Sequence, residues 1–254
     1  MADRTGHLIV ALDFPTLQDA ADMARRLSAH VAAVKIGSQL FTAEGPRAVQ
    51  AMRDLGLRVF LDLKFHDIPN TVAGAVASAS KLGVWMLNVH CSGGSAMMAE
   101  AAKAAADSAA ADRPLVLGVT VLTSLDETSL RATLGTTRTL REQVQYLARE
   151  AQSTGLDGVV ASPQEIIDIR QVCGKGFLVV TPGVRPAASA TGDQKRVLTP
   201  GEAVHAGADY VVVGRPIIAA KDPVEAAQRI AEECHSSRTE SREPRAERPE
   251  PRSG

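Results

Sequence analysis

The sequence predicts one α/β domain in the form of a closed (β/α)8 barrel. Short runs rich in Val, Ile and Leu recur along the chain, and Ala-rich segments with helical spacing separate them. Apolar strands that alternate with helices form a parallel sheet whose faces the helices cover. Eight such units within 254 residues are typical of a sheet that closes on itself. An open doubly wound sheet is the alternative that this pattern leaves open.

Eight segments are expected to form the strands, and about eight helices are expected to alternate strictly with them. Each strand segment is a short apolar run, as expected for a strand that is buried on both faces. The clearest helical segments, 16–30 and 94–111, combine Ala with charged residues at helical spacing. The predicted strands are residues 8–14, 32–37, 57–65, 85–91, 115–123, 156–162, 177–184 and 210–217.

Two segments fall outside this repeat. Residues 185–200 are small and polar and lie between the seventh strand and the next helix, which is typical of a loop that covers a ligand. Residues 235–254 are rich in Arg, Glu and Pro and have little to bury, so we expect a disordered tail. The predicted organisation is therefore a barrel domain over residues 1–234 and a tail over residues 235–254.

Composition and charge limit the possible partners. The formal net charge is −1, so we expect no general attraction to nucleic acid or to an anionic membrane. Five Phe, two Tyr and one Trp are too few for a surface that stacks on single-stranded nucleic acid. Three widely spaced cysteines suggest neither a disulfide framework nor a zinc site. Without an apolar stretch of signal-peptide or membrane-span length, we expect a cytoplasmic protein.

Charged residues gather where the first three strands end. Asp62 and Lys64 are two positions apart, so their side chains share one face of a strand. Lys35 lies near the end of the preceding strand, Asp13 closes the first strand, and Asp67 follows the third. One structural salt bridge is the simpler interpretation. An alternating Lys-Asp-Lys-Asp array at a barrel mouth is better suited to proton transfer or to carbanion chemistry.

The residues that follow this cluster have two interpretations. Pro69 suits the first turn of a helix, and Asp67, Asn70 and Thr71 are residue types that cap helices. The string DIPNT is thus either an ordinary junction between strand and helix or a set of polar groups held beside the site. The spacing alone does not decide between them.

A second set of residues suggests a phosphate site. The seventh and eighth strands each lead into Gly and Arg, in the strings TPGVRP and VVVGRP. In barrels the loops after these strands often bind phosphate, because glycine lets backbone N–H groups approach and Arg offers a planar pair of donors. The residues concerned are Gly183, Arg185, Gly214 and Arg215, with Gln194 in the loop between them.

The strings DLKFHDIPNT, TPGVRP, GDQKR and GRP together resemble the orotidine 5'-monophosphate decarboxylase family of bacterial type. The resemblance extends from about residue 8 to about residue 230. It implies a dimeric barrel that converts orotidine 5'-monophosphate into uridine 5'-monophosphate and carbon dioxide, without a metal or an organic cofactor. This reaction is the last step of de novo pyrimidine nucleotide synthesis.

The resemblance also implies roles for individual residues. Lys64 resembles the proton donor to C6 of the pyrimidine, and Asp62 resembles the carboxylate beside the substrate carboxylate. Lys35 completes the charged array. The remaining matches are Asp13 and Lys35 as ribose contacts, Thr123 as a substrate contact, Arg185, Gln194, Gly214 and Arg215 on the phosphate side, and Asp67, Ile68 and Thr71 as residues that reach into the neighbouring subunit's site.

Two other functions remain as alternatives. The shorter pattern D-x-K-x-x-D is shared with sugar-phosphate decarboxylases and aldol-type synthases, which resemble this chain and use magnesium. A noncatalytic nucleotide-binding protein would keep the phosphate site and the charged tail. Chelator sensitivity distinguishes the first alternative, and ligand binding without product distinguishes the second.

Overall fold

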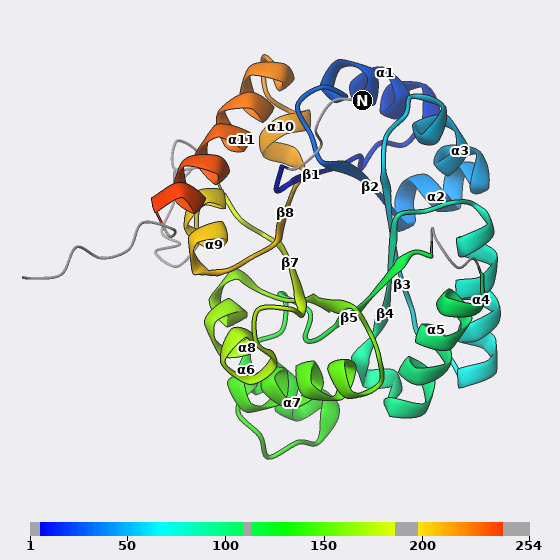
Figure 1. Ribbon diagram of the computed structural model, residues 1–254, viewed down its shortest axis with the longest axis vertical. Helices are drawn as coiled ribbons and strands as arrows, with labels where there is room; N and C mark the ends of the chain where they lie inside the picture. The colour runs from blue at the N-terminus through cyan, green and yellow to red at the C-terminus, as the bar shows by residue number, and fades with distance from the viewer. Residues whose placement is uncertain (1–5, 109–112, 186–197, 241–254) are drawn as a thin grey trace, which may run out of the picture.

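The computed structural model describes residues 6–108, 113–185 and 198–240. Eight parallel strands pair in chain order, and the eighth pairs with the first, so the sheet closes into a barrel with helices around it (Figure 1). The predicted TIM barrel is confirmed, and the open sheet is excluded. The strands are β1 (Leu8–Ala11), β2 (Ala33–Gly37), β3 (Val59–Phe65), β4 (Met86–His90), β5 (Leu115–Val119), β6 (Gly158–Val160), β7 (Leu178–Pro182) and β8 (Tyr210–Val213).

Within the described residues, eleven α-helices surround the barrel, where about eight were expected. The strict alternation is wrong at three places, because two helices follow each of β2, β5 and β8. After β2, for example, Gly45 adopts φ +60° and Pro46 starts a new helix. The helices are α1 (Leu17–Leu27), α2 (Ser38–Glu44), α3 (Pro46–Asp54), α4 (Pro69–Lys81), α5 (Ser95–Ser108), α6 (Glu127–Leu134), α7 (Leu140–Ser153), α8 (Ile166–Cys173), α9 (Pro200–Ala206), α10 (Arg215–Ile218) and α11 (Pro223–Glu240).

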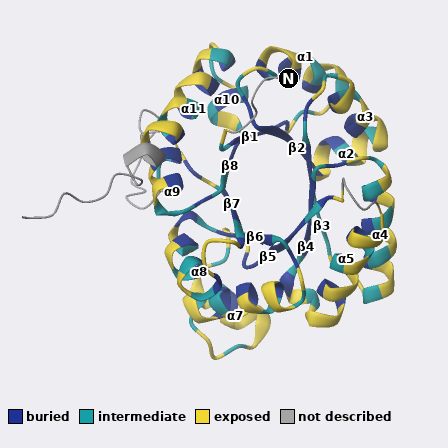
Figure 2. Cartoon of the chain, viewed as in Figure 1, coloured by how far each residue is buried: buried dark blue, intermediate teal, exposed yellow. Residues whose placement is uncertain are grey.

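The apolar side chains form two separate clusters, one on each side of the sheet. Alternation along β1 shows the division, since Ile9 packs inside the barrel while Leu8 and Val10 pack between the sheet and the helices. The inner cluster includes Phe60 and Met86 and fills the barrel. Figure 2 shows the same division, with buried strands at the centre and exposed outer faces on the helices.

The turn into β6 is closed by a glycine and an aspartate. Gly155 has φ +85°, which a residue with a side chain rarely adopts, and the Leu156 N–H donates to the Ala151 carbonyl at 3.1 Å. The Asp157 carboxylate accepts a hydrogen bond from the Val116 N–H at 2.8 Å. It also accepts hydrogen bonds from Nη1 and Nη2 of Arg113. This aspartate joins β5 to β6 at the end of the barrel opposite to the strands' carboxyl ends.

The turn into β8 repeats this arrangement. Gly207 has φ +114°, and the Ala208 N–H donates to the Ala203 carbonyl at 2.9 Å. Asp209 accepts the Val179 N–H at 2.8 Å and the Arg170 Nη2 at 2.6 Å. An aspartate that accepts a backbone N–H and an arginine therefore joins β7 to β8, as Asp157 joins β5 to β6.

The predicted segments outside the repeat have different outcomes. Residues 186–197, which include Gln194, and residues 241–254 lie outside the described residues. Helix α11 continues to Glu240, so the start of the predicted tail, residues 235–240, is helical rather than disordered. No helix in the described part of the chain is both long and apolar enough to cross a membrane.

Candidate active site

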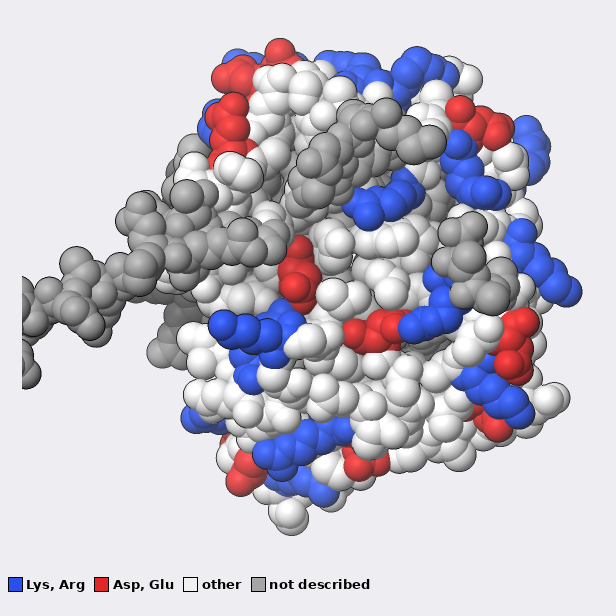
Figure 3. Space-filling view, viewed as in Figure 1, with Lys and Arg blue, Asp and Glu red and all other residues white. Residues whose placement is uncertain are grey.

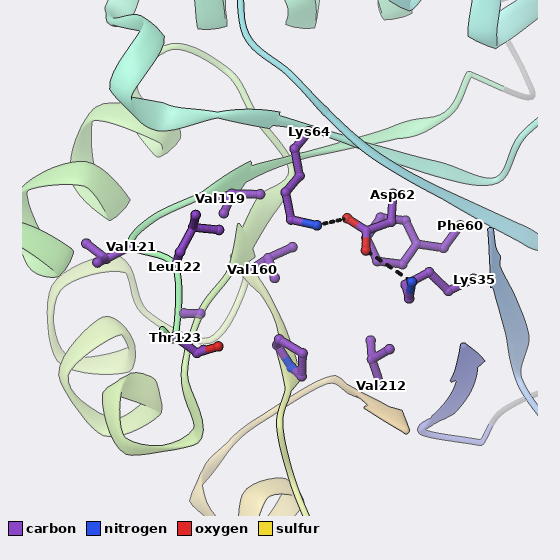
Figure 4. A pocket seen from close by; sticks show the side chains of 12 residues that line it. Lys35, Phe60, Asp62, Lys64, Val119, Val121, Leu122, Thr123, Val160 and Val212 are labelled. Carbon is purple, nitrogen blue, oxygen red and sulfur yellow. Dashed lines mark hydrogen bonds and ion pairs between the residues drawn. The ribbon is translucent and has the colours of Figure 1, made fainter. Parts of the chain in front are cut away.

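Four charged side chains from the first three strand ends meet at the mouth of the barrel. Lys35 lies between two carboxylates, with its Nζ 3.2 Å from Asp13 Oδ1 and 3.3 Å from Asp62 Oδ2. The Nζ of Lys64 is 2.6 Å from Asp62 Oδ1 (Figure 4). The order of charges is Asp13, Lys35, Asp62, Lys64, so each carboxylate lies beside an ammonium group. A lone structural salt bridge does not describe this site.

The elements place these side chains differently. Lys35 belongs to β2, and Asp62 and Lys64 belong to β3, as expected. Strand β1 ends at Ala11, so Asp13 lies in the turn beyond the strand and is exposed. Lys35 is buried, and Asp62 and Lys64 are partly buried.

The charge of Asp62 depends on its neighbours. Burial on its own would raise the pKa of this carboxyl, but Lys35 and Lys64 outweigh that effect, together with hydrogen bonds from Lys64 and Asn88. The net result is a pKa below the usual range for aspartate. Asp62 is therefore ionised at neutral pH, although it is largely enclosed.

Lys64 interrupts the regular geometry of β3. Its φ is +52°, and among the described residues it is the one non-glycine residue with a positive φ. The register with β4 shifts at this point, since β3 advances from Leu61 to Phe65 while β4 advances only from Leu87 to Val89. The strand is thus bulged at Lys64.

The expected division of β3 into two faces nevertheless holds. Leu61, Leu63 and Phe65 pack against the outer cluster under the helices, whereas Asp62 and Lys64 point into the mouth.

Sequence reasoning missed Asn88. This residue of β4 has 0% of its surface exposed, and its side chain contacts both site residues of β3. Its Oδ1 accepts the Lys64 N–H at 2.8 Å, and its Nδ2 donates to Asp62 Oδ1 at 2.7 Å. The one available signal was an amide residue within the apolar run WMLNVHC.

A cavity of about 230 Å³ opens beside Lys35, Asp62 and Lys64. Its other walls are mostly apolar, and sequence reasoning identified only Thr123 among them. Figure 4 shows labelled apolar side chains, such as Val119, Val160 and Val212, arranged around this cavity. The remaining lining residues are Phe60, Val119, Val121, Leu122, Val160, Ala161, Pro182 and Val212.

A second cavity adjoins the first and contains the predicted phosphate residues. Lys35, Pro182 and Val212 line both cavities. The second cavity is also lined by Gly183, Arg185, Gly214 and Arg215, and by Asp13.

The ends of the predicted covering loop lie close together beside this cavity. The Arg185 N–H donates to the Leu198 carbonyl at 3.2 Å, which joins the two ends. Gln194 lies outside the described residues. On the face shown in Figure 3, positive and negative side chains are interspersed over the described surface.

The residues of DIPNT stand apart from the charged network. In the single chain Asp67 accepts the Ile68 N–H and has no ion pair among the described residues. Ile68 is 67% exposed, which is unusual for a large apolar side chain, and Thr71 is exposed on α4. The expected Lys-Asp-Lys-Asp array therefore contains Asp13 in one chain and not Asp67.

Two histidines lie beside the network. The rings of His66 and His90 are 5.4 Å apart. Burial lowers the pKa of His90, and the nearby His66 and Lys64 lower it further, while Asp62 opposes them. His90 is thus neutral near pH 7. Within the described residues, no three His, Cys, Asp or Glu side chains gather in a metal-binding arrangement.

Comparison with known proteins identifies the relatives of this chain. Residues 6–230 match the family model described as orotidine 5'-phosphate decarboxylase / HUMPS family. The chain is 55% identical to orotidine 5'-phosphate decarboxylase of Moorella thermoacetica, over 85% of this chain and 86% of the relative. It is 51% identical to the protein of the same name from Pseudoalteromonas translucida, over 86% and 92% of the two chains.

A solved structure gives the same result. The crystal structure of orotidine 5'-phosphate decarboxylase from Lactobacillus acidophilus superposes with a TM-score of 0.81 at 37% identity. The similarity covers 90% of this chain and 99% of the other. The resemblance inferred from the motifs is confirmed.

Proposed function

We propose a mechanism from the premise that this chain belongs to the orotidine 5'-phosphate decarboxylase / HUMPS family. It is a carboxy-lyase that converts orotidine 5'-monophosphate into uridine 5'-monophosphate in pyrimidine biosynthesis. The curated relatives at 55% and 51% identity share the decarboxylase name, which favours this reaction over the sugar-phosphate alternative. The observation that supports the mechanism best is the Asp13, Lys35, Asp62, Lys64 network between two adjoining cavities.

The chemical step requires a stabilised carbanion. The bond between C6 and the carboxyl carbon breaks, carbon dioxide leaves, and the electron pair stays on C6 in an orbital that the ring does not delocalise well. The Lys64 ammonium stabilises this negative charge and then transfers a proton to C6, and solvent returns a proton to the neutral amine. Asp62 lies beside the leaving carboxylate and holds the Lys64 ammonium at 2.6 Å. The network thus provides charges that are fixed before the reaction begins.

The rest of the substrate occupies the neighbouring positions. Asp13 and Lys35 bind the ribose, and Thr123 contacts the substrate from the apolar cavity. Arg185, Gly214 and Arg215 bind the phosphate in the second cavity, and Gln194 completes this group from the covering loop. Phosphate binding contributes to catalysis because it holds the pyrimidine in register with Lys64.

The active protein is a homodimer with shared sites, and it works in the cytoplasm without a metal. Asp67, Ile68 and Thr71 serve the neighbouring subunit's site, which accounts for their exposure in the single chain. The three cysteines are free and buried, in keeping with a reducing compartment. Lys64 supplies the positive charge that a metal would otherwise supply.

The decisive experiment follows the loss of substrate absorbance in the presence of a chelator. We expect full activity with chelator, and inhibition would favour the magnesium-dependent alternative. Lys64→Ala should lower kcat by at least about 10³-fold, because it removes both the charge and the proton. The matched control is Lys175→Ala, an exposed lysine that precedes β7 at the opposite end of the barrel. Thermal stabilisation by the nucleotide without any product would indicate the noncatalytic alternative.

A further inference from the structure

We infer that Asn88 is a positioning residue for the reaction, whose carboxamide fixes both the backbone of Lys64 and the carboxylate of Asp62. This inference rests on the proposed function and adds a residue to it. Asn88 lies in β4 below the charged network and is fully buried. Asn88 lines neither of the two cavities and bonds to Asp62 and Lys64, so it acts through these two residues.

Strand β3 is bulged at Lys64, and this bulge needs support. At φ +52° a lysine backbone is strained, and the surrounding structure has to offset that strain. The bulge also turns the Lys64 N–H away from the ladder between β3 and β4. Asn88 Oδ1 accepts this N–H at 2.8 Å, so a side chain replaces the missing ladder acceptor. Without it, a partly buried N–H would lose its hydrogen bond.

Asn88 also fixes the orientation of the Asp62 carboxylate. Its Oδ1 accepts from Lys64 Nζ at 2.6 Å and from Asn88 Nδ2 at 2.7 Å, while Oδ2 faces Lys35. The two contacts of Asn88 also determine its own orientation. The Lys64 N–H needs an acceptor and the Asp62 carboxylate needs a donor, so a flipped amide would lose both bonds.

Together these contacts link the backbone conformation of β3 to the position of the Lys64 ammonium group. The Lys64 side chain lines the first cavity from the bulged backbone, and Asp62 holds its ammonium there at 2.6 Å. The Asn88 amide bonds both to the Lys64 N–H and to the Asp62 carboxylate, so it fixes the lysine backbone and the carboxylate that holds the lysine ammonium. Small displacements of a reacting group can lower the rate about 100-fold, so we expect Asn88 to affect kcat more than substrate binding.

Two variants separate positioning from a purely structural role. Asn88→Ala removes both hydrogen bonds, and we expect kcat to fall about 100-fold while KM changes little. Asn88→Asp keeps an acceptor for the Lys64 N–H and donates to Asp62 only when it is protonated. Two adjacent carboxylates hold one proton tightly, so this variant should be most active at low pH and lose activity as the pH rises. The other titratable groups that interact with Asp62 are Lys35, Lys64 and His90.

The control is Val89→Ala, which changes a fully buried neighbour on the opposite face of the same strand. We expect this variant to lose stability and to keep the wild-type kcat and pH profile. If Asn88→Ala does not fold, Asn88→Asp carries the test. An Asn88→Asp pH profile parallel to that of the wild type, with kcat within about twofold, would overturn the inference. Wild-type protein without turnover would instead overturn the proposed function, so the two failures are distinct.

Discussion

At the scale of single residues, the site depends on how closely Lys35 is enclosed. Its ammonium has a carboxylate on either side, at 3.2 Å and 3.3 Å, and Gly37 lies against it from the same strand. A Cβ atom on Gly37 would approach Lys35 Nζ to 2.9 Å and Asp13 Oδ1 to 3.4 Å. The φ of Gly37 is −94°, which any residue can adopt, so its backbone does not require glycine. A glycine is needed here because it leaves space for the Lys35 ammonium group.

We expect Gly37→Ala to fold normally and to lose kcat/KM. The end of the lysine side chain is flexible, so it can move away from the new methyl group, but it then leaves its place between Asp13 and Asp62. A loss of roughly 10- to 100-fold in kcat/KM is expected from such a displacement. Steady-state kinetics and thermal unfolding measure the two effects. Gly176→Ala is the control, because a Cβ there meets nothing within 4 Å. Equal kinetics in both variants would contradict this account.

Glu165 provides a test of pH dependence away from the network. Burial raises the pKa of this carboxyl to about 7, although the Ser162 N–H that it accepts at 2.9 Å opposes the shift and the charge of Asp168 adds to it. The folded state therefore binds a proton more tightly than the unfolded chain. The resulting stabilisation is present below about pH 4.5, the ordinary pKa of the residue, and is lost as the pH rises toward 7.

Glu165→Gln should remove this dependence, because glutamine carries no charge and still accepts the Ser162 N–H. Relative to wild type, we expect the variant to gain about 1–3 kcal/mol of stability at pH 8 and little at pH 4. Urea unfolding at the two pH values measures the difference. A gain that is the same at both values would show that the carboxyl does not titrate with folding.

At the scale of elements, two aspartates join neighbouring strands at the end opposite to the site. Asp157 and Asp209 each accept one backbone N–H and one arginine, but the arginines differ in exposure. The Arg170 side chain is 15% exposed, whereas that of Arg113 is 40% exposed. A buried charge without its partner is more costly than one that water can reach.

Asp209→Ala should therefore destabilise the fold more than Asp157→Ala. We expect a loss of about 3 kcal/mol for Asp209→Ala, because Arg170 would stay buried without its carboxylate. For Asp157→Ala we expect about 1–2 kcal/mol, mainly from the unpaired Val116 N–H. Denaturant unfolding of both variants gives the order. The reverse order would mean that exposure of the arginine does not determine the loss.

The elements also show how far the sequence could predict the structure. All eight strands were predicted, because a strand buried on both faces leaves a continuous apolar run. The paired helices after β2, β5 and β8 were missed, since breaks such as Gly45-Pro46 also occur in ordinary loops. The strand alternation was right for Asp62 and Lys64 even though the backbone between them is bulged.

The charged cluster was predicted because its residues lie near or just beyond the carboxyl ends of strands. Asp13, Lys35, Asp62 and Lys64 could be grouped, because the carboxyl ends of parallel strands meet at one edge. Asn88 could not be assigned, because its role depends on the register shift between β3 and β4. The apolar cavity walls were missed for a related reason, since Val119 or Val160 in a strand looks the same whether it fills a core or lines a cavity.

At the scale of the whole molecule, the question is what covers Asp67, Ile68 and Thr71. These residues follow the charged strand directly, yet they contribute nothing to the network of their own chain. The proposed dimer places them over the neighbouring subunit's site. Activity should then require two subunits, and each site would contain Lys64 from one chain and Asp67 from the other.

Mixing two inactive variants tests this arrangement. Lys64→Ala and Asp67→Ala should each be nearly inactive, and an equal mixture should recover about a quarter of the wild-type activity, because half of the dimers are mixed and each has one intact site. Activity after verified subunit exchange is the measurement, with each variant exchanged against itself as the control. No recovery would count against shared sites.

The residues that line the two adjoining cavities carry a local excess of positive charge, although the net charge of the chain is −1. Their described lining residues contain four cations and two carboxylates, a difference of two positive charges: Lys35, Lys64, Arg185 and Arg215 against Asp13 and Asp62. A field of this sign speeds the arrival of a substrate that carries a phosphate and a carboxylate, and added salt weakens it. The product has lost the carboxylate, so the same field holds it less strongly. The reaction itself therefore favours exchange of product for new substrate.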